Sequence, residues 1–79
     1  MIDTVKNKPI KVSISGDLSY LVVPFEQLDK ITALLDANQV SYWVDEEVLS
    51  MDGGPEIAFI NLSRGTDPGM VQRLLDSVP

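Results

Sequence analysis

The chain has 79 residues and a formal net charge of −6, and it contains neither histidine nor cysteine. The missing side chains exclude an imidazole base, a thiol nucleophile, a redox dithiol and nearly all zinc and haem sites. The negative charge repels nucleic acids and anionic membranes. We therefore expect no cofactor, no nucleic-acid partner and no membrane partner.

The hydrophobic content of 44% is enough for a packed core. A chain of this length buries only about 60–65% of its unfolded surface, so a second subunit would help to stabilise it. Residues 1–8 are polar and without pattern, which predicts a mobile N-terminal tail before a single domain over residues 9–79. This first segment lacks the apolar stretch of a signal peptide, and the absence of cysteine favours a cytoplasmic protein.

Hydrophobic and polar residues alternate over residues 10–15, which predicts a half-buried strand. A Gly-Asp pair at 16–17 forms a two-residue hairpin turn, and residues 18–23 return as a second strand. A turn of this length pairs Ile14 with Ser19. On the sheet face away from the core, the register then places Leu18, Tyr20 and Val22.

Residues 24–37 predict a helix, because a proline opens the segment and large hydrophobic residues recur at helical spacing. Residues 40–44 are rich in β-formers and predict a third strand. Tyr42 and Trp43 must point to opposite faces of this strand. The pattern leaves the phase open and favours Trp43 on the outer side.

A short strand is expected within residues 48–51, turning at the Asp-Gly pair 52–53. Residues 57–62 form the most apolar segment and predict a central strand. Thr66 or Asp67 then caps a second helix that a proline enters at its first turn. The apolar stripe of that helix comprises Met70, Val71, Leu74, Leu75 and Val78.

These elements predict an α+β two-layer sandwich in the order ββαββα, with both helices on one face of a four-stranded sheet. Short connections and right-handed crossovers favour the spatial order 1-2-4-3, with strands 2 and 4 parallel in the middle. This order resembles a ferredoxin-like sheet whose last strand has moved to the front. The architecture is similar to that of ACT-type and other ferredoxin-like regulatory modules.

A sheet with both helices on one side leaves its other face open. Aromatic residues on such a face point to a protein partner, because large apolar surface is rarely left exposed and tryptophan is enriched at binding hot spots. The residues that we expect at an interface are Tyr20, Val22 and Trp43.

Arg64, Gly65 and Thr66 lie between the central strand and the second helix. Free backbone N–H groups at a helix start, a hydroxyl and a guanidinium together suit an anion such as a phosphate or a carboxylate. Asp67 would place a negative charge at the same point, and the segment lacks the spacing of a phosphate-binding loop. A plain capped turn is the favoured interpretation, with an anion site as the alternative.

Five carboxylates cluster in the loop after the third strand. They are hard ligands of the kind that Ca²⁺ and Mg²⁺ prefer, but their spacing is not that of an EF-hand. A solvated charged loop is favoured, and we assign no metal site. The residues are Asp45, Glu46, Glu47, Asp52 and Glu56.

Catalysis is the least favoured function, because no histidine is present to activate a serine or threonine. The favoured hypothesis is a non-enzymatic interaction or assembly module that acts as a homo-oligomer, most simply a homodimer, or that binds another protein. One alternative is a sensing or regulatory module for a small anionic metabolite. A second alternative is an accessory enzyme subunit with a carboxylate site.

Overall fold

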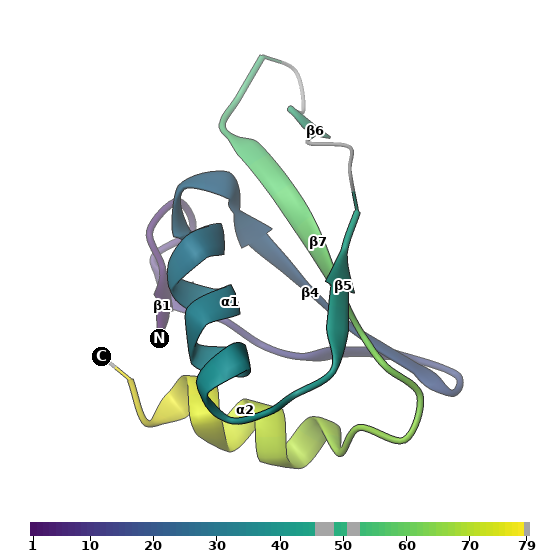
Figure 1. Cartoon of the computed structure of the whole chain (residues 1–79). Coiled ribbons are helices and arrows are strands. Elements are labelled where there is room, and N and C mark those ends of the chain that lie inside the picture. The colour runs from purple at the N-terminus through teal and green to yellow at the C-terminus, as the bar shows by residue number, and fades with distance from the viewer. Residues whose placement is uncertain (46–48, 51–52, 79) are drawn as a thin grey trace.

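The computed structural model describes residues 1–45, 49–50 and 53–78. They form a small α+β domain with two α-helices, a two-stranded antiparallel sheet and a larger antiparallel sheet (Figure 1). In chain order the elements are β1 (Ile2–Asp3), β2 (Lys8–Pro9), β3 (Ser13–Ser15), β4 (Leu18–Pro24), the 3₁₀ turn η1 (Phe25–Gln27), α1 (Leu28–Ala37), β5 (Tyr42–Val44), β6 (Leu49–Ser50), β7 (Glu56–Leu62) and α2 (Pro68–Asp76).

The larger sheet has the order β3-β4-β7-β5, and β6 also pairs with β7. Ile57 of β7 lies opposite both Pro24 of β4 and Leu49 of β6. Since a strand has only two edges, β6 must lie on the same side of β7 as β5. Written in the numbering of the predicted strands, the spatial order is 1-2-4-3.

The direction of the central strand corrects one expectation. The second and fourth predicted strands were expected to run parallel, but β4 and β7 are antiparallel. The helical crossover leaves β4 and β5 parallel to each other, whereas β7 returns antiparallel to β5. The strand that lies between two parallel neighbours and is antiparallel to one of them must be antiparallel to the other.

The β3–β4 hairpin has the predicted register, since Ile14 lies opposite Ser19. Its first strand is shorter than predicted, because residues 10–12 leave β4 and turn to α2. The side-chain amide of Gln72 takes the place of a strand partner there: its Oε1 accepts a hydrogen bond from the Val12 N–H (2.9 Å) and its Nε2 donates to the Ile10 carbonyl (3.0 Å).

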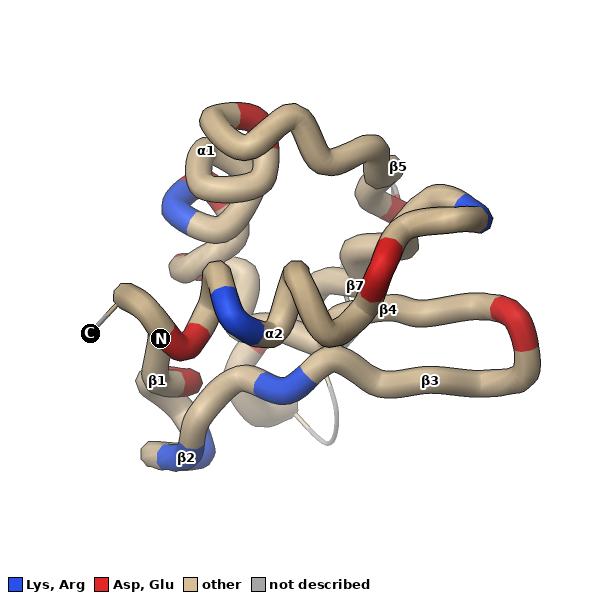
Figure 2. Tube along the Cα trace, turned by 90° about the horizontal axis from the view of Figure 1, so that it is seen from below, with Lys and Arg blue, Asp and Glu red and all other residues tan. Residues whose placement is uncertain are grey.

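The structure also differs from the tail expected over residues 1–8. This segment forms the β1–β2 hairpin, which lies beside α2 in Figure 2. Gln27 holds the hairpin to η1, because its Nε2 donates to the Ile2 carbonyl (2.7 Å) and its Oε1 accepts from the Thr4 N–H (3.0 Å). These contacts are hydrogen bonds to backbone groups and leave no hydrophobic periodicity in the sequence, so the sequence pattern does not predict them.

One hydrophobic cluster joins both helices to the same face of the larger sheet. Figure 1 shows α1 upright beside the sheet and α2 lying crosswise beneath it. The buried members of this core are Ile10, Leu21, Val23, Ile31, Leu35, Val40, Ala58, Ile60, Leu62, Val71 and Leu75. Both helices therefore pack on one face of the larger sheet, as expected.

Of the two predicted caps for α2, the structure has Asp67. Its Oδ1 accepts a hydrogen bond from the Gly69 N–H at 2.9 Å, and Pro68 occupies the first helical turn, where its missing N–H leaves no bond unmade. Val71 and Leu75 of the predicted stripe are fully buried, while Met70 and Leu74 are half-buried.

Truncation of the α2 stripe should separate its buried position from its half-buried one. We expect Leu75→Ala to lower the free energy of unfolding by about 2–4 kcal/mol, because the side chain is completely buried. Leu74→Ala, at the adjacent half-buried position, is the matched control and should cost less. Urea unfolding followed by circular dichroism measures both, and equal losses would mean that the helix is rotated on the sheet.

The Gln72 side chain should likewise stabilise residues 10–12. We expect Gln72→Ala to lower the free energy of unfolding by about 1–2 kcal/mol and to speed amide exchange at Val12. Gln72→Glu keeps the acceptor for the Val12 N–H but cannot donate to the Ile10 carbonyl, so its exchange rate should be intermediate. Unchanged exchange at Val12 in both variants would show that the segment is held by other contacts.

Candidate interaction surface

The side of the larger sheet away from the helices carries a continuous set of side chains from the neighbouring strands β4, β7 and β5. The pairing places Tyr20 of β4 opposite Asn61 of β7, and Asn61 opposite Trp43 of β5. In the next row, Val22 lies opposite Phe59. We call this surface the open face and define it by Tyr20, Val22, Trp43, Phe59 and Asn61.

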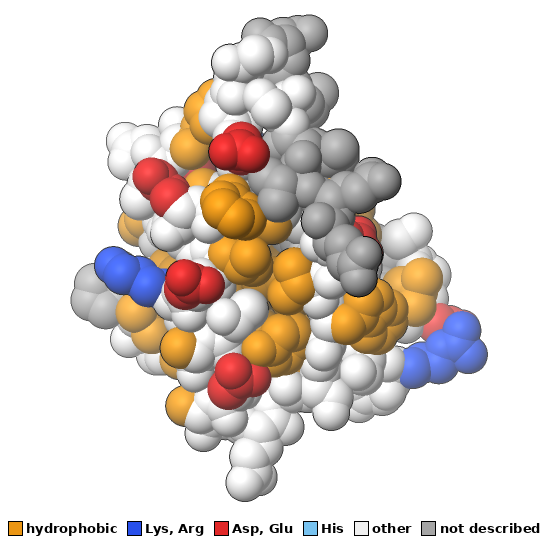
Figure 3. Space-filling view, turned by 45° about the horizontal axis from the view of Figure 1, so that its top comes forward, with side chains coloured by type: hydrophobic (Ala, Val, Ile, Leu, Met, Phe, Trp, Pro, Cys, Tyr) orange, Lys and Arg blue, Asp and Glu red, His pale blue; other side chains and the backbone are white. Residues whose placement is uncertain are grey.

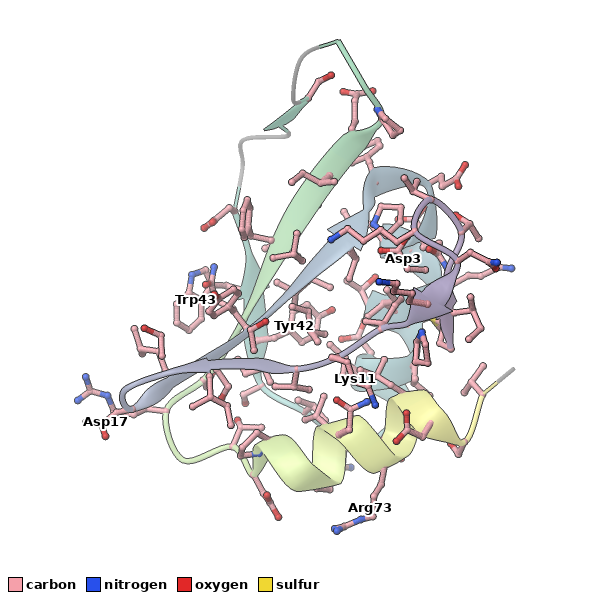
Figure 4. The ribbon with its side chains drawn as sticks, turned by 180° about the vertical axis from the view of Figure 1, so that it is seen from behind. Asp3, Lys11, Asp17, Tyr42, Trp43 and Arg73 are labelled. Atoms are coloured by element: carbon pink, nitrogen blue, oxygen red, sulfur yellow. The ribbon has the colours of Figure 1, made fainter. Side chains whose placement is uncertain are left out.

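The register of β5 settles the phase that the sequence left open. Tyr42 and Val44 lie opposite the buried residues of β7 and pack against the core, so Trp43 points to the open face. Its side chain is 52% exposed. Figure 4 shows the molecule from this side, with Trp43 at the β5 edge.

The three residues expected at an interface, Tyr20, Val22 and Trp43, are thus brought onto one face. Tyr20 and Val22 are half-buried. Phe59 lies on the same face, opposite Val22, and was not among the residues expected there. Residues 57–60 are all apolar, so hydrophobicity alone cannot tell which of them face the helices.

A polar contact borders the open face beside Trp43. The Asn61 Nδ2 donates a hydrogen bond to Asp45 Oδ1 at 3.1 Å, and the Asp45 N–H donates to the Phe59 carbonyl at 3.1 Å. These bonds fix the end of β5 against β7. Trp43 is therefore presented by a strand whose position is held at both the backbone and the side-chain level.

The loop of Arg64, Gly65 and Thr66 lines an open depression of about 370 Å³. Two of the backbone donors near the start of α2 are already used, and a carboxylate lies beside them. The Thr66 N–H donates to the Ser63 carbonyl at 3.0 Å, the first α2 donor is capped, and the carboxylate of Asp67 lines the same depression. Gly65 has a φ of +90°, which favours glycine for reasons of backbone geometry alone. The arrangement supports the capped turn over the anion site.

Two of the five clustered carboxylates, Asp45 and Glu56, belong to the described part of the chain, and both are exposed. Glu46, Glu47 and Asp52 lie outside the described residues. Within the described ranges, no three acidic residues are placed so that they could share a metal ion.

A further contact joins β5 to α1. The Tyr42 hydroxyl donates a hydrogen bond to Asp36 Oδ1 at 2.7 Å. This bond raises the pKa of Tyr42 above its ordinary value of 10.0, and burial and the negative charge of Asp36 act in the same direction. Tyr42 thereby ties the inner side of β5 to the helix, while Trp43 points away.

The side of the molecule that carries α1 has a different character. Figure 3 shows hydrophobic side chains in a strip across its middle, bordered by acidic side chains. On α1 and β5, the half-buried hydrophobic residues that pack against the core are Leu28, Leu34, Tyr42 and Val44. Because these side chains cover the core directly, a strip of this kind has a structural explanation without a partner.

Comparison with known proteins gave no relatives: no family model matches the chain, and neither the curated proteins nor the solved structures contain a match.

Over the described residues, the helices are too short and too polar to cross a bilayer.

The Tyr42–Asp36 bond has a consequence for stability at alkaline pH. The raised pKa means that the folded state holds the phenolic proton more tightly, so this stabilisation is full below the ordinary value of about 10 and is lost as the pH rises through the folded pKa. In a Tyr20→Phe background, where Tyr42 is the remaining tyrosine, Asp36→Ala should lower its pKa. Absorbance of the tyrosinate measures it, and an unchanged titration would contradict the bond.

Proposed function

We propose that this protein is a non-enzymatic interaction module that forms a homodimer through the open face and the adjoining β5 edge. The observation that carries the proposal is the placement of Tyr20, Val22, Phe59 and Trp43 together on a sheet face that neither helix covers. Aromatic side chains bury much area with little loss of conformational entropy and dominate binding hot spots.

The β5 strand supplies a geometry for the contact. Among the described strands it pairs only with β7, so its outer backbone edge is available to a second chain. Trp43 is the middle residue of the three-residue strand. Antiparallel pairing of β5 with its own copy, centred on Trp43, would bring two tryptophans together on one face under a two-fold axis.

Electrostatics gives the dimer a distinctive salt dependence. Each chain carries a formal charge of −6, so two copies repel one another at low ionic strength. Salt screens charges on the surface over a Debye length of about 8–10 Å near physiological ionic strength. Association through an apolar face should therefore strengthen with added salt, whereas association through ion pairs would weaken.

The arrangement of the strands also supports a likeness to ferredoxin-like folds. The order β4, α1 and β5, with β7 inserted antiparallel between the two strands, is that of a split β-α-β unit. On this ground we describe the fold as a permuted ferredoxin-like sandwich. The absence of cysteine supports a cytoplasmic location.

Light scattering after gel filtration tests the dimer. We expect a dimer mass at micromolar concentration, and we expect Trp43→Ser to give the monomer mass. Phe25→Ser is the matched control, because Phe25 is a similarly exposed aromatic residue (45%) that lies off the open face. Raising the salt concentration should shift the wild-type chain further toward the dimer.

Three results would overturn the proposal. These are a monomer mass for the wild-type chain at every salt concentration, a dimer that weakens as salt is added, and an equal loss of dimer in the Trp43→Ser and Phe25→Ser variants.

A further inference from the structure

The N-terminal segment forms one wall of a second hollow, distinct from the Arg64 loop. This pocket has a volume of about 320 Å³ and lies where the β1–β2 hairpin and the chain leading to β3 border the sheet. Figure 4 shows Asp3 and Lys11 on this side of the molecule. The residues that line it are Asp3, Lys6, Lys8, Pro9, Ile10, Lys11, Ser13 and Val22. We call it the lysine pocket.

The charge of the lysine pocket is opposite to that of the molecule. It holds three of the six basic residues of a chain whose net charge is −6. Figure 2 shows the basic positions at β2 and on the chain between β2 and β3 along one side. A cleft lined by one sign of charge concentrates ions of the other sign, so this is the place where an anion would be attracted.

The single carboxylate in the lining, that of Asp3, stabilises the β1–β2 hairpin. Asp3 is only 7% exposed, and its Oδ1 accepts hydrogen bonds from the N–H groups of Val5 and Lys6, both at 2.8 Å. These bonds close the turn of the β1–β2 hairpin. Lys6, Lys8 and Lys11, by contrast, are exposed and can bring their ammonium groups to a ligand.

The rest of the lining is apolar, with one hydroxyl. Pro9 and Val22 offer hydrophobic surface, and Ser13 can donate or accept a hydrogen bond. We infer that the lysine pocket binds a small organic anion, with a dianionic group, such as a phosphomonoester or a dicarboxylate, on the lysines and an apolar part on Val22 and Pro9.

The size of the pocket favours a small molecule over a macromolecule. Ligand clefts commonly have volumes of about 300–1,000 Å³, and the lysine pocket lies at the lower end of that range. Lysine ammonium groups bind phosphate and carboxylate as point charges and adjust to either. The shared chemistry is therefore the double negative charge, and the two kinds of anion form separate arms of the test.

Nuclear magnetic resonance titration of the ¹⁵N-labelled chain tests the inference. The probes are phenyl phosphate, inorganic phosphate, glutarate and uncharged phenol. We expect phenyl phosphate to give saturable shifts at the amides of Lys8, Lys11 and Val22 and to bind more tightly than inorganic phosphate, which lacks an apolar part. Binding of glutarate at the same amides would extend the ligand class to dicarboxylates, and its absence would restrict the class to phosphates.

A charge-matched pair of double variants is the control. Lys8→Gln with Lys11→Gln should weaken phenyl phosphate binding about tenfold or more. Lys30→Gln with Arg73→Gln changes the net charge equally, but neither residue lines the pocket, so binding should change by less than about twofold. Repeating the titration with Trp43→Ser separates this inference from the proposed dimer, since the pocket does not include Trp43.

Four outcomes would overturn the inference. These are no saturable shift from any anion up to about 10 mM, equal shifts from phenol and phenyl phosphate, equal weakening in the two double variants, and binding of a tetraglutamate peptide where no small anion binds.

Discussion

The pairing of β7 is the constraint on which the rest of the structure depends. Over one stretch it is hydrogen-bonded to β4 on one edge and to β5 and β6 on the other. Because side chains alternate along a strand, this single register sends Ala58, Ile60 and Leu62 into the core and leaves Phe59 and Asn61 on the open face. A slip of one residue would exchange the two sets, so core and candidate surface are fixed together.

Two glutamines extend this sheet-based core to the N-terminal segment. Gln27 forms hydrogen bonds to the backbone of the β1–β2 hairpin, and Gln72 forms hydrogen bonds to the backbone of residues 10–12, which have left β4. An amide side chain offers one acceptor and two donors, so it can replace a short length of neighbouring strand. The segment thereby becomes part of the domain without a hydrophobic stripe of its own, and the pocket wall that it forms is positioned by side-chain amides from both helical regions.

The sequence predicted what local chemistry decides and missed what distant contacts decide. The Ile14–Ser19 register follows from a two-residue turn, and the cap of α2 follows from an aspartate before a proline. The direction of β7 depends on how two connections combine in space. Tyr20 and Val22 could be placed on the outer face because alternation and the turn register mark them. The phase of Trp43 stayed open until the pairing of β5 was known, and Phe59 lies in an uninterrupted apolar run. The β1–β2 hairpin rests on Gln27, and no periodicity marks its residues.

The open face and the lysine pocket meet at Val22, which belongs to both. The exposed Trp43 lies at one end of this surface, on the edge strand β5. The lysine pocket, with three of the six basic residues of the chain, lies at the other end. A second chain packed over Val22 and an anion resting on Val22 would share contact area. Linkage then requires that each change the affinity of the other by the same factor. If the two compete, anion binding would dissociate the dimer. A dimer confined to the Trp43 end would instead leave the lysine pocket free. The extent of coupling therefore reports how far the interface reaches across the sheet.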